Sequence, residues 1–346
     1  AKTGIALNTT ATTLDALNTT SGAINITETD GVNVAQLAQT TGGDISLTAG
    51  SINLNALVTI NAVSGNIVLG ADAVALDATS LIQSTGTLTI QPLTATTTIG
   101  IGGGAGTLNI DAIEVGRLVD GFSSITLGSA TGSGAMIVNA YTWLDSVKFD
   151  TADAGSITIA GDQTAASDSY ITLAGPTTLS AGVDLTATAG TTGTINIAAE
   201  GGTVTPSTTS IISADIFDMQ TGTWNEINST LSTFNITDFR ITGGTFQRFL
   251  SGDGLLVITP YLIADVYGLQ GIDSFGVTTA YFKLNQNINA SVTSSWNNTG
   301  TAKGFVPIGG ATFPNGELVI LLIKNVISII ITLILFLNNQ IIYFYF

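Results

Sequence analysis

The chain has 346 residues, with 24 acidic and 8 basic side chains and a net charge of −16. This surplus of negative charge excludes nucleic acid, which proteins bind through clustered lysine and arginine, and it disfavours anionic lipid as a partner. Histidine and cysteine are both absent, which removes disulfides, thiolate metal sites and every catalytic centre that depends on an imidazole.

A five-residue phrase repeats in the first third of the chain: a glycine, any residue, then two aliphatic residues separated by one other. It begins at Gly22, Gly43, Gly65, Gly86 and Gly106. The first aliphatic residue of each phrase follows the one before by 21, 22, 21 and 20 residues. A fixed period of this size marks stacked repeats, and the alternation indicates a strand with one buried face.

Two further series share this period. One contains Val32-Asn-Val34, Ile52-Asn-Leu54 and Val74-Ala-Leu76, and a looser one contains Leu37, Val58 and Leu81. Three strand series with one period predict an all-β chain, a right-handed parallel β-helix (β-solenoid) with three short strands in each coil of about 20–22 residues. The recurring glycine is expected at a corner, where the backbone needs φ > 0.

The period loosens after residue 110. Strand phrases recur at Ile125, Ile157, Ile171 and Ile195, and we expect them to continue the coils with insertions. The stretch 130–152 holds Tyr141, Trp143 and Phe149 and is expected to bulge out of the stack.

Composition divides the chain into three parts. Residues 1–205 hold five aromatic residues and are assigned to β-helix repeats, whereas residues 206–316 hold fourteen and are expected to continue the solenoid as an aromatic-rich β region. Residues 317–346 form a hydrophobic tail without Gly, Ala, Pro or Asp. The stretch 318–337 is long enough to span a bilayer. The tail is interpreted as a membrane anchor, a buried strand pair or a sequence artefact, and a membrane is a partner only in the first case.

Three segments resemble the repeat region of large bacterial filamentous haemagglutinin-like proteins. They are residues 98–134, the sequence DFRITGGTF at 238–246, and residues 265–309, where Gly268-Leu-Gln-Gly271, Trp296 and Phe305-Val-Pro-Ile-Gly309 resemble the region that leads into GLUG-type repeats. The resemblance implies a secreted or outer-membrane-associated adhesin, exported by two-partner secretion through an outer-membrane partner, with host or surface glycans as ligands. The N-terminal secretion domain of such proteins has no counterpart in this sequence.

Glycines and aspartates of the repeats are interpreted as turn residues. Gly100-Ile-Gly102-Gly-Gly-Ala105 has the loose spacing of a nucleotide-binding loop, but a strand phrase follows it instead of a helix. Calcium-binding β-roll repeats need an aspartate where Leu108 stands. The isolated aspartates bind calcium at most weakly and adventitiously: Asp72, Asp77, Asp111, Asp153 and Asp162. No cofactor and no metal site is predicted.

No pattern in the sequence points to catalysis. β-Helix enzymes that cleave polysaccharides need a pair or cluster of carboxylates on one face, often with a basic partner. Asp215 lies close to Asp218 in sequence, and Asp238 lies close to Arg240. Both arrangements are interpreted as turn residues or surface ion pairs. The chain is predicted not to be an enzyme.

One surface remains as a candidate for binding, and the polar ladder on the outside of the coils is interpreted as a solvated face because it mixes Asn, Ser and Thr. Aromatic residues of the second part are candidates for stacking on a carbohydrate, although packing in the core explains most of them equally well: Trp224, Tyr261, Tyr267, Tyr281 and Trp296. Outward positions form a polar ladder: Asn25, Ser46, Asn53, Thr89, Asn109, Thr126, Thr158, Thr172 and Asn196. We expect a rigid, non-enzymatic stalk for cell-surface attachment. The alternatives are a secreted polysaccharide-degrading β-helix enzyme and an ice- or surface-binding solenoid, which would need a flat Thr-x-Thr face.

Overall fold

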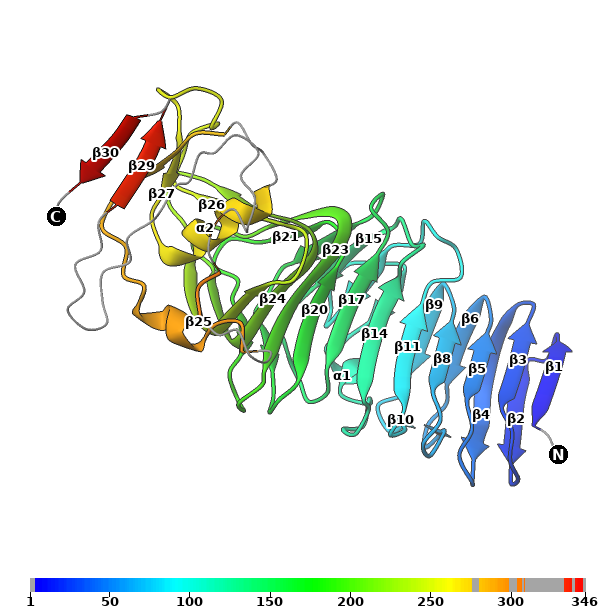
Figure 1. Ribbon diagram of the computed structural model, residues 1–346. Coiled ribbons are helices and arrows are strands. Elements are labelled where there is room, and N and C mark those ends of the chain that lie inside the picture. The colour runs from blue at the N-terminus through cyan, green and yellow to red at the C-terminus, as the bar shows by residue number, and fades with distance from the viewer. Residues whose placement is uncertain are drawn as a thin grey trace.

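The computed structural model describes residues 4–275, 280–298, 304–306, 308, 333–337 and 340–344. Strands make up 49% of the chain, and parallel pairing stacks them into a right-handed β-solenoid of about 13 turns. Figure 1 shows the coils following one another from the N-terminus towards a cap of short helices and strands. The fold class predicted from the repeats is therefore confirmed.

Three faces of strands run along the solenoid. Face 1 contains β1 (Ile5–Thr9), β3 (Ile24–Glu28), β5 (Ile45–Thr48), β8 (Ile67–Gly70), β11 (Thr87–Gln91), β14 (Ser124–Ser129), β17 (Val147–Thr151) and β20 (Tyr170–Ala174). Face 2 contains β6 (Ser51–Leu54), β9 (Ala73–Leu76), β12 (Ile99–Ile101), β13 (Leu108–Ile110), β15 (Ala135–Val138), β18 (Ser156–Ile159), β21 (Thr177–Leu179) and β26 (Thr245–Phe249).

Face 3 and the corners complete each coil. Face 3 contains β7 (Thr59–Asn61), β10 (Leu81–Gln83), β16 (Tyr141–Trp143), β19 (Gln163–Ala165) and β22 (Leu185–Ala187). Longer strands bend round a corner and serve more than one face: β2 (Thr13–Asn18), β4 (Gly31–Gln39), β23 (Thr194–Thr205), β24 (Ile211–Ile227) and β25 (Thr233–Ile241).

One column of inward side chains runs the length of face 1. Its members pair in register from coil to coil: Ile5, Ile24, Ile45, Ile67, Leu88, Ile125, Val147, Ile171, Ile195, Phe217 and Phe239. Every member after Ile5 is buried. The column skips two positions expected in this series, because Leu108 and Ile157 lie on face 2, where they pair with Ile99 and Met136.

The insertion between β11 and β14, residues 92–123, explains why Leu108 is skipped. Within it the chain forms β12 and then β13, which pair in parallel only nine residues apart, followed by the short helix α1 (Ala112–Val115). Asp111 caps this helix, and Glu114 Oε1 accepts a hydrogen bond of 2.7 Å from the backbone N–H of Leu76 in β9. Leu118 then returns to face 3 beside Ile82, so the coil closes before β14 begins.

Of the other two predicted series of strands, the structure confirms one and contradicts part of the other. The second is confirmed, because Val32, Ile52 and Val74 pair in register on face 2. The third is in part wrong, because the inward column of face 3 continues from Leu37 to Ile60 and Ile82 instead of Val58 and Leu81.

The predicted bulge at 130–152 is also wrong. These residues form β15, β16 and β17 within the stack, and Trp143 and Phe149 are buried in the core. The stack departs from its regular period at 92–123 instead.

The repeated glycines allow successive coils to approach closely at one corner. A Cβ built on Gly43, Gly65 or Gly86 would lie 2.6, 2.1 and 2.4 Å from the carbonyl oxygen of the repeat glycine one coil earlier. Gly22 and Gly43 have positive φ, as predicted, but Gly65 and Gly86 do not. Close approach of the backbones therefore requires glycine at the latter two positions.

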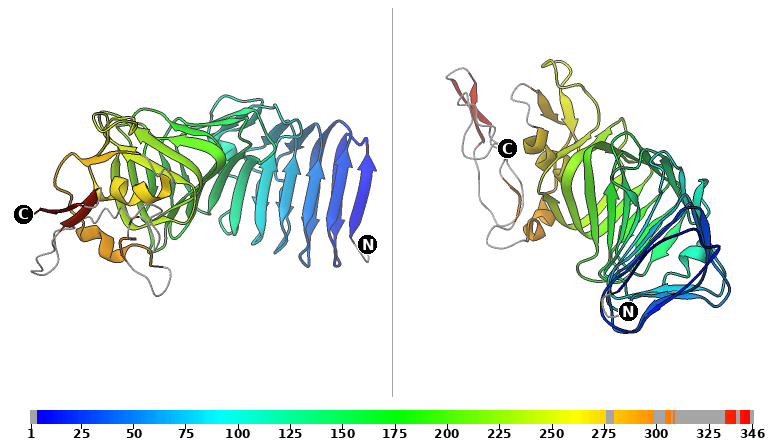
Figure 2. Two further views of the ribbon diagram at one scale, coloured as in Figure 1. Left: turned by 45° about the horizontal axis from the view of Figure 1, so that its top comes forward. Right: turned by 90° about the vertical axis from the view of Figure 1, so that its right-hand side faces the viewer.

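The solenoid continues beyond residue 206, as expected, and then receives a cap. Parallel pairings of β24 with β25 and β26 carry the stack to Phe249. The cap consists of β27 (Tyr261–Ile263), α2 (Val266–Gly271), the 3₁₀ helices η1 (Ile272–Phe275) and η2 (Ser291–Ser295), and β28 (Phe282–Leu284). Figure 2 shows it at the end of the stack opposite the N-terminus. Val266, Tyr267 and Trp296 join the main core, so the cap covers the interior of the last coil.

The hydrophobic tail lies largely outside the described residues. Its described parts, β29 (Leu333–Leu337) and β30 (Gln340–Phe344), pair as an antiparallel hairpin. The stretch 318–332 of the predicted membrane span belongs to the part that is not described. Among the described residues no helix has the length and apolar character needed to span a membrane.

Candidate functional site

Four of the five aromatic residues predicted to stack on a carbohydrate are buried, so that prediction is wrong for them. Trp224 and Trp296 are fully buried, and Tyr261 and Tyr267 are at most 9% exposed. They are buried because rings fill the interior of the last coils and the cap. Trp296, for example, stacks on Tyr267 with a centroid distance of 5.1 Å. Tyr281 is the exception, with 46% of its surface exposed.

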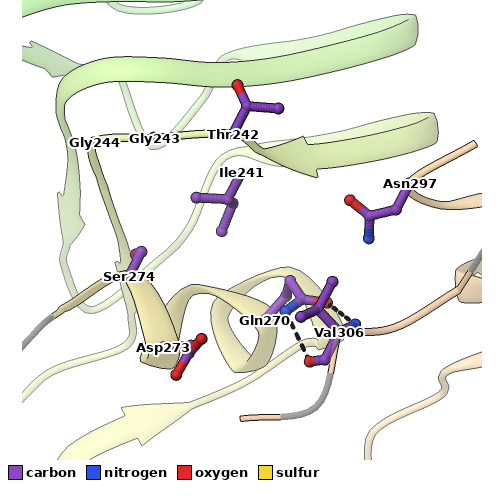
Figure 3. Close-up of a pocket in the computed structure, with 9 residues that line it drawn as sticks. All are labelled: Ile241, Thr242, Gly243, Gly244, Gln270, Asp273, Ser274, Asn297 and Val306. Carbon is purple, nitrogen blue, oxygen red and sulfur yellow. Dashed lines mark hydrogen bonds between the residues drawn. The ribbon is translucent and has the colours of Figure 1, made fainter. Parts of the chain in front are cut away.

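A cavity of about 230 Å³ lies between the last coils and the cap. Thr242, Gly243 and Gly244, on the turn after β25, form one wall, and Gln270 and Asp273, on α2 and η1, form another (Figure 3). The turn is tight: Gly244 has a φ of +65°, and a Cβ on Gly243 would lie 2.2 Å from the carbonyl oxygen of Gln220.

The polar groups that line this cavity hold the cap together. Gln270 Nε2 donates to the carbonyl oxygen of Val306 at 3.1 Å, and its Oε1 accepts from the N–H of Val306 at 2.8 Å. Ser274 Oγ accepts from the N–H of Phe246 at 2.8 Å and donates to the carbonyl oxygen of Gly271. Asp273 is the single carboxylate on the described lining. The described lining of this cavity therefore lacks the carboxylate pair that glycoside hydrolysis requires.

A pair of carboxylates that sequence reasoning missed consists of Asp120, near the end of the insertion, and Asp145 in the following coil. The N–H of Gly121 donates to both oxygens of Asp145, at 3.1 and 3.3 Å. Burial raises the pKa of the Asp145 carboxyl, and the neighbouring Asp120 carboxyl adds to this effect. The adjoining cavity has a volume of only about 20 Å³. It has room for about one water molecule and none for a sugar ring.

The sequence reveals this pair only when the residues of successive coils are aligned in the correct register. Asp120 follows the return of the chain to face 3, and Asp145 lies 25 residues later at the corresponding corner of the next coil. The irregular step of the insertion conceals that correspondence, because Leu88 pairs with Ile125 at a distance of 37 residues instead of 21 or 22.

Asp238 and Arg240 form the ion pair expected from the sequence, but the pair is largely buried in β25 instead of lying on the surface. Asp238 Oδ2 lies 2.6 Å from the Nη2 of Arg240, and Asp215 accepts a hydrogen bond of 3.1 Å from the N–H of Gly193. Among the predicted turn aspartates, Asp72, Asp77, Asp111 and Asp162 accept hydrogen bonds from backbone N–H groups, and Asp153 is exposed. Within the described residues no three His, Cys, Asp or Glu side chains gather into a group that could hold a metal ion.

The polar ladder is divided between two faces. Its members on face 1 are Asn25, Ser46, Thr89, Thr126, Thr172 and Asn196, and those on face 2 are Asn53, Asn109 and Thr158. Val68 and Lys148 interrupt the row on face 1. A flat, regular Thr-x-Thr surface, which ice binding would need, is not formed by the described coils. The glycine run at 100–105 is not a turn throughout, because Gly100 and Ile101 belong to β12, and the predicted turn between β12 and β13 begins at Gly102.

Neither a protein-family model, nor a curated protein, nor a solved structure matches the chain.

Proposed function

We propose that the chain is a non-enzymatic structural module: a rigid stalk within a larger exported bacterial surface protein that serves cell-surface attachment. The observation that carries this proposal is the inward column of face 1, which stays in register from Ile5 to Phe239. An unbroken parallel register of this kind specifies length and stiffness, because every coil is bonded to the coils on both sides of it.

The placement of acidic side chains relative to the cavities supports the same role. Of the two cavities described above, the larger has Asp273 as the single carboxylate on its described lining, and the smaller, of about 20 Å³, adjoins the Asp120–Asp145 pair. Neither provides a groove for a polysaccharide. The cap shields the end of the hydrophobic core, which prevents non-specific pairing at that end of the sheet stack.

The place of the module follows from the resemblance of residues 98–134, 238–246 and 265–309 to filamentous haemagglutinin-like proteins. We infer export through an outer-membrane secretion partner, a secreted or outer-membrane-associated location, and host or surface glycans as the molecules to which the whole protein attaches. The net charge of −16 keeps such a stalk soluble and separate from its neighbours.

Small-angle scattering tests the stalk directly. About 13 turns at ~4.8 Å each predict a stiff body of about 60 Å along the solenoid axis. A maximum dimension that shrinks or broadens with ionic strength would contradict rigidity. A glycan array tests attachment, and incubation with a polysaccharide panel tests the alternative. Release of new reducing ends would contradict the stalk proposal and favour a secreted β-helix enzyme that degrades polysaccharides.

A further inference from the structure

Four consecutive aliphatic side chains protrude from the loop that joins β26 to β27. Leu255, Leu256, Val257 and Ile258, which we call the aliphatic tip, are 74, 56, 72 and 80% exposed. Single exposed aliphatic residues are ordinary on protein surfaces, but four in succession at one loop are not. The loop belongs to the capped end of the solenoid (Figure 1).

The loop holds the aliphatic tip in a fixed shape. Asp253 Oδ1 accepts hydrogen bonds from the N–H of Leu255 at 3.0 Å and from the hydroxyl of Thr259 at 2.6 Å. The N–H of Gly254 donates to the carbonyl oxygen of Thr259, and the N–H of Thr259 donates to that of Leu256, both at 3.0 Å. The exposed side chains are thus presented by an ordered turn, and little backbone entropy is lost when they are covered.

The segment hydrogen-bonded to the base of the aliphatic tip carries an exposed tyrosine and an exposed lysine. The N–H of Tyr281 donates to the carbonyl oxygen of Gly254 at 2.9 Å, which places the half-exposed Tyr281 directly behind the tip. Lys283, two residues further on in β28, is exposed. Aliphatic residues, a tyrosine and a lysine are the side chains that suit, in turn, the acyl chains, the interfacial region and the headgroup phosphates of a bilayer.

Charge decides which kind of bilayer fits. The chain carries a net charge of −16, which opposes approach to an anionic surface. Hydrogen bonds from the Thr259 hydroxyl and the Leu255 N–H lower the pKa of Asp253, so the base of the loop is negative at neutral pH. The tip is also convex, and a fluid acyl layer surrounds a convex apolar group on all sides. We propose that the aliphatic tip inserts into a zwitterionic phospholipid bilayer.

This proposal goes beyond the stalk role and does not depend on it. Four aliphatic side chains bury about as much apolar surface as a single acyl anchor, so the expected binding is weak and reversible, with an association constant on the order of 10⁴ M⁻¹. A stalk end with such affinity would adhere only where several copies act together.

A fluorescent label at the tip tests insertion in the full chain. The chain has no cysteine, so Val257→Cys can be labelled uniquely with an environment-sensitive nitrobenzoxadiazole dye. Leu93→Cys is the matched control: Leu93 is 51% exposed and lies in the insertion, far from the tip in the sequence. With phosphatidylcholine vesicles we expect a blue shift and quenching by brominated lipid at position 257, and neither at position 93. An unchanged spectrum at position 257 would overturn the proposal.

A second variant measures the contribution of the tip to binding. Replacement of all four tip residues by serine should lower vesicle partitioning by roughly tenfold or more, while phosphatidylserine should not strengthen binding of the unaltered chain. Every variant keeps residues 317–346, so a difference between variants reports the tip alone. Equal partitioning of both chains would overturn the proposal. So would a blue shift at position 257 that needs no lipid and grows with protein concentration, which would assign the tip to a second copy of the chain.

Discussion

The regular coils from β3 to β11 and the last coils from β23 to β26 use the same register with different interiors. In the first region the face 1 column consists of Ile24, Ile45, Ile67 and Leu88, and in the second it reaches Phe217 and Phe239. The aromatic column is joined by Trp224 and Phe246, with ring centroids 5.4 to 6.0 Å apart. Backbone pairing therefore sets the coil, and side-chain volume inside it is free to vary.

The two regions also differ in what holds neighbouring coils together. Glycines stacked at one corner let the regular coils approach closely, whereas the last coils depend on a buried ionic network around Arg248. Arg248 bonds Glu226, Asp265 at 2.8 Å, and both the hydroxyl and the carbonyl oxygen of Ser232. Because Asp265 also caps α2, this network ties the cap to the solenoid.

The largest expected effect comes from the aromatic interior. Phe217→Ala removes a fully buried ring that contacts Trp224, Phe234, Phe239 and Phe246, and should lower the free energy of unfolding by about 3–5 kcal/mol. Urea unfolding followed by tryptophan fluorescence measures it, because Trp224 reports this region. Ile67→Val, at the same column position in the regular coils, should cost only about 0.5–1.5 kcal/mol. A larger loss for Ile67→Val would mean that the regular coils, not the aromatic ones, limit stability.

The buried ionic network should show a similarly large effect. Arg248→Met leaves Glu226, which is 3% exposed, without its cation, and should destabilise the last coils by about 3–5 kcal/mol. Lys148→Met removes the partner of Asp150 at a side chain 39% exposed, and should change stability by at most about 1 kcal/mol. Hydrogen exchange would locate the loss, which we expect in α2 and β26. Uniform loss over the whole stack would argue against a local role in holding the cap.

Much of the fold could be predicted because faces 1 and 2 carry two inward residues per strand. A pair such as Ile24 and Ile26 defines both the period and the direction of the side chains. Face 3 gives a weaker signal, because β7 and β10 each bury a single residue, Ile60 and Ile82. The insertion was concealed because Leu108-Asn-Ile110 copies the repeated phrase at the expected distance but pairs with β12.

The candidate site could be predicted less well, although part of the signal was present. Phe217 and Phe239 alternate with the polar Asp218 and Arg240, and this period of two marks the aromatic residues as core. Tyr267 and Trp296 carry no such pattern, because a helix and a loop bring them over the last coil. The exposure of the aliphatic tip was equally hidden, since four consecutive aliphatic residues are also typical of a buried strand.

The repeated glycines of the regular coils offer an intermediate effect. In Gly65→Ala the new methyl group would lie 2.1 Å from the carbonyl oxygen of Gly43, so the coils must separate, at about 1–3 kcal/mol. Gly70→Ala, at the other end of β8, meets only the Thr48 side chain at 3.5 Å or more, and should be neutral or slightly stabilising. Thermal unfolding of the two variants side by side measures the difference. Equal melting temperatures would show that close approach at the corner is not what requires glycine.

The smallest expected effects are changes in stability with pH. They have opposite signs at Asp72, in a regular coil, and at Asp145, in the coil after the insertion. Burial opposes ionisation of Asp72, but hydrogen bonds from Thr94 and Thr97 outweigh it, so its pKa lies below the ordinary value of 3.8. Its contribution to stability is present above that value and is lost as the pH falls through the folded pKa. Burial raises the pKa of Asp145, so its contribution is present below 3.8 and is lost as the pH rises through the folded pKa.

Two asparagine variants separate these contributions. Between about pH 3 and about pH 6, Asp72→Asn should lose stability relative to the unaltered chain as the pH rises, whereas Asp145→Asn should gain it, each by about 1 kcal/mol or less. Urea midpoints across this range give the sign, which matters more than the size. A shared sign would mean that Asp145 is as well solvated as Asp72. The insertion would then present its carboxylates to water as the regular coils do, and the contrast between the two regions would rest on their interiors alone.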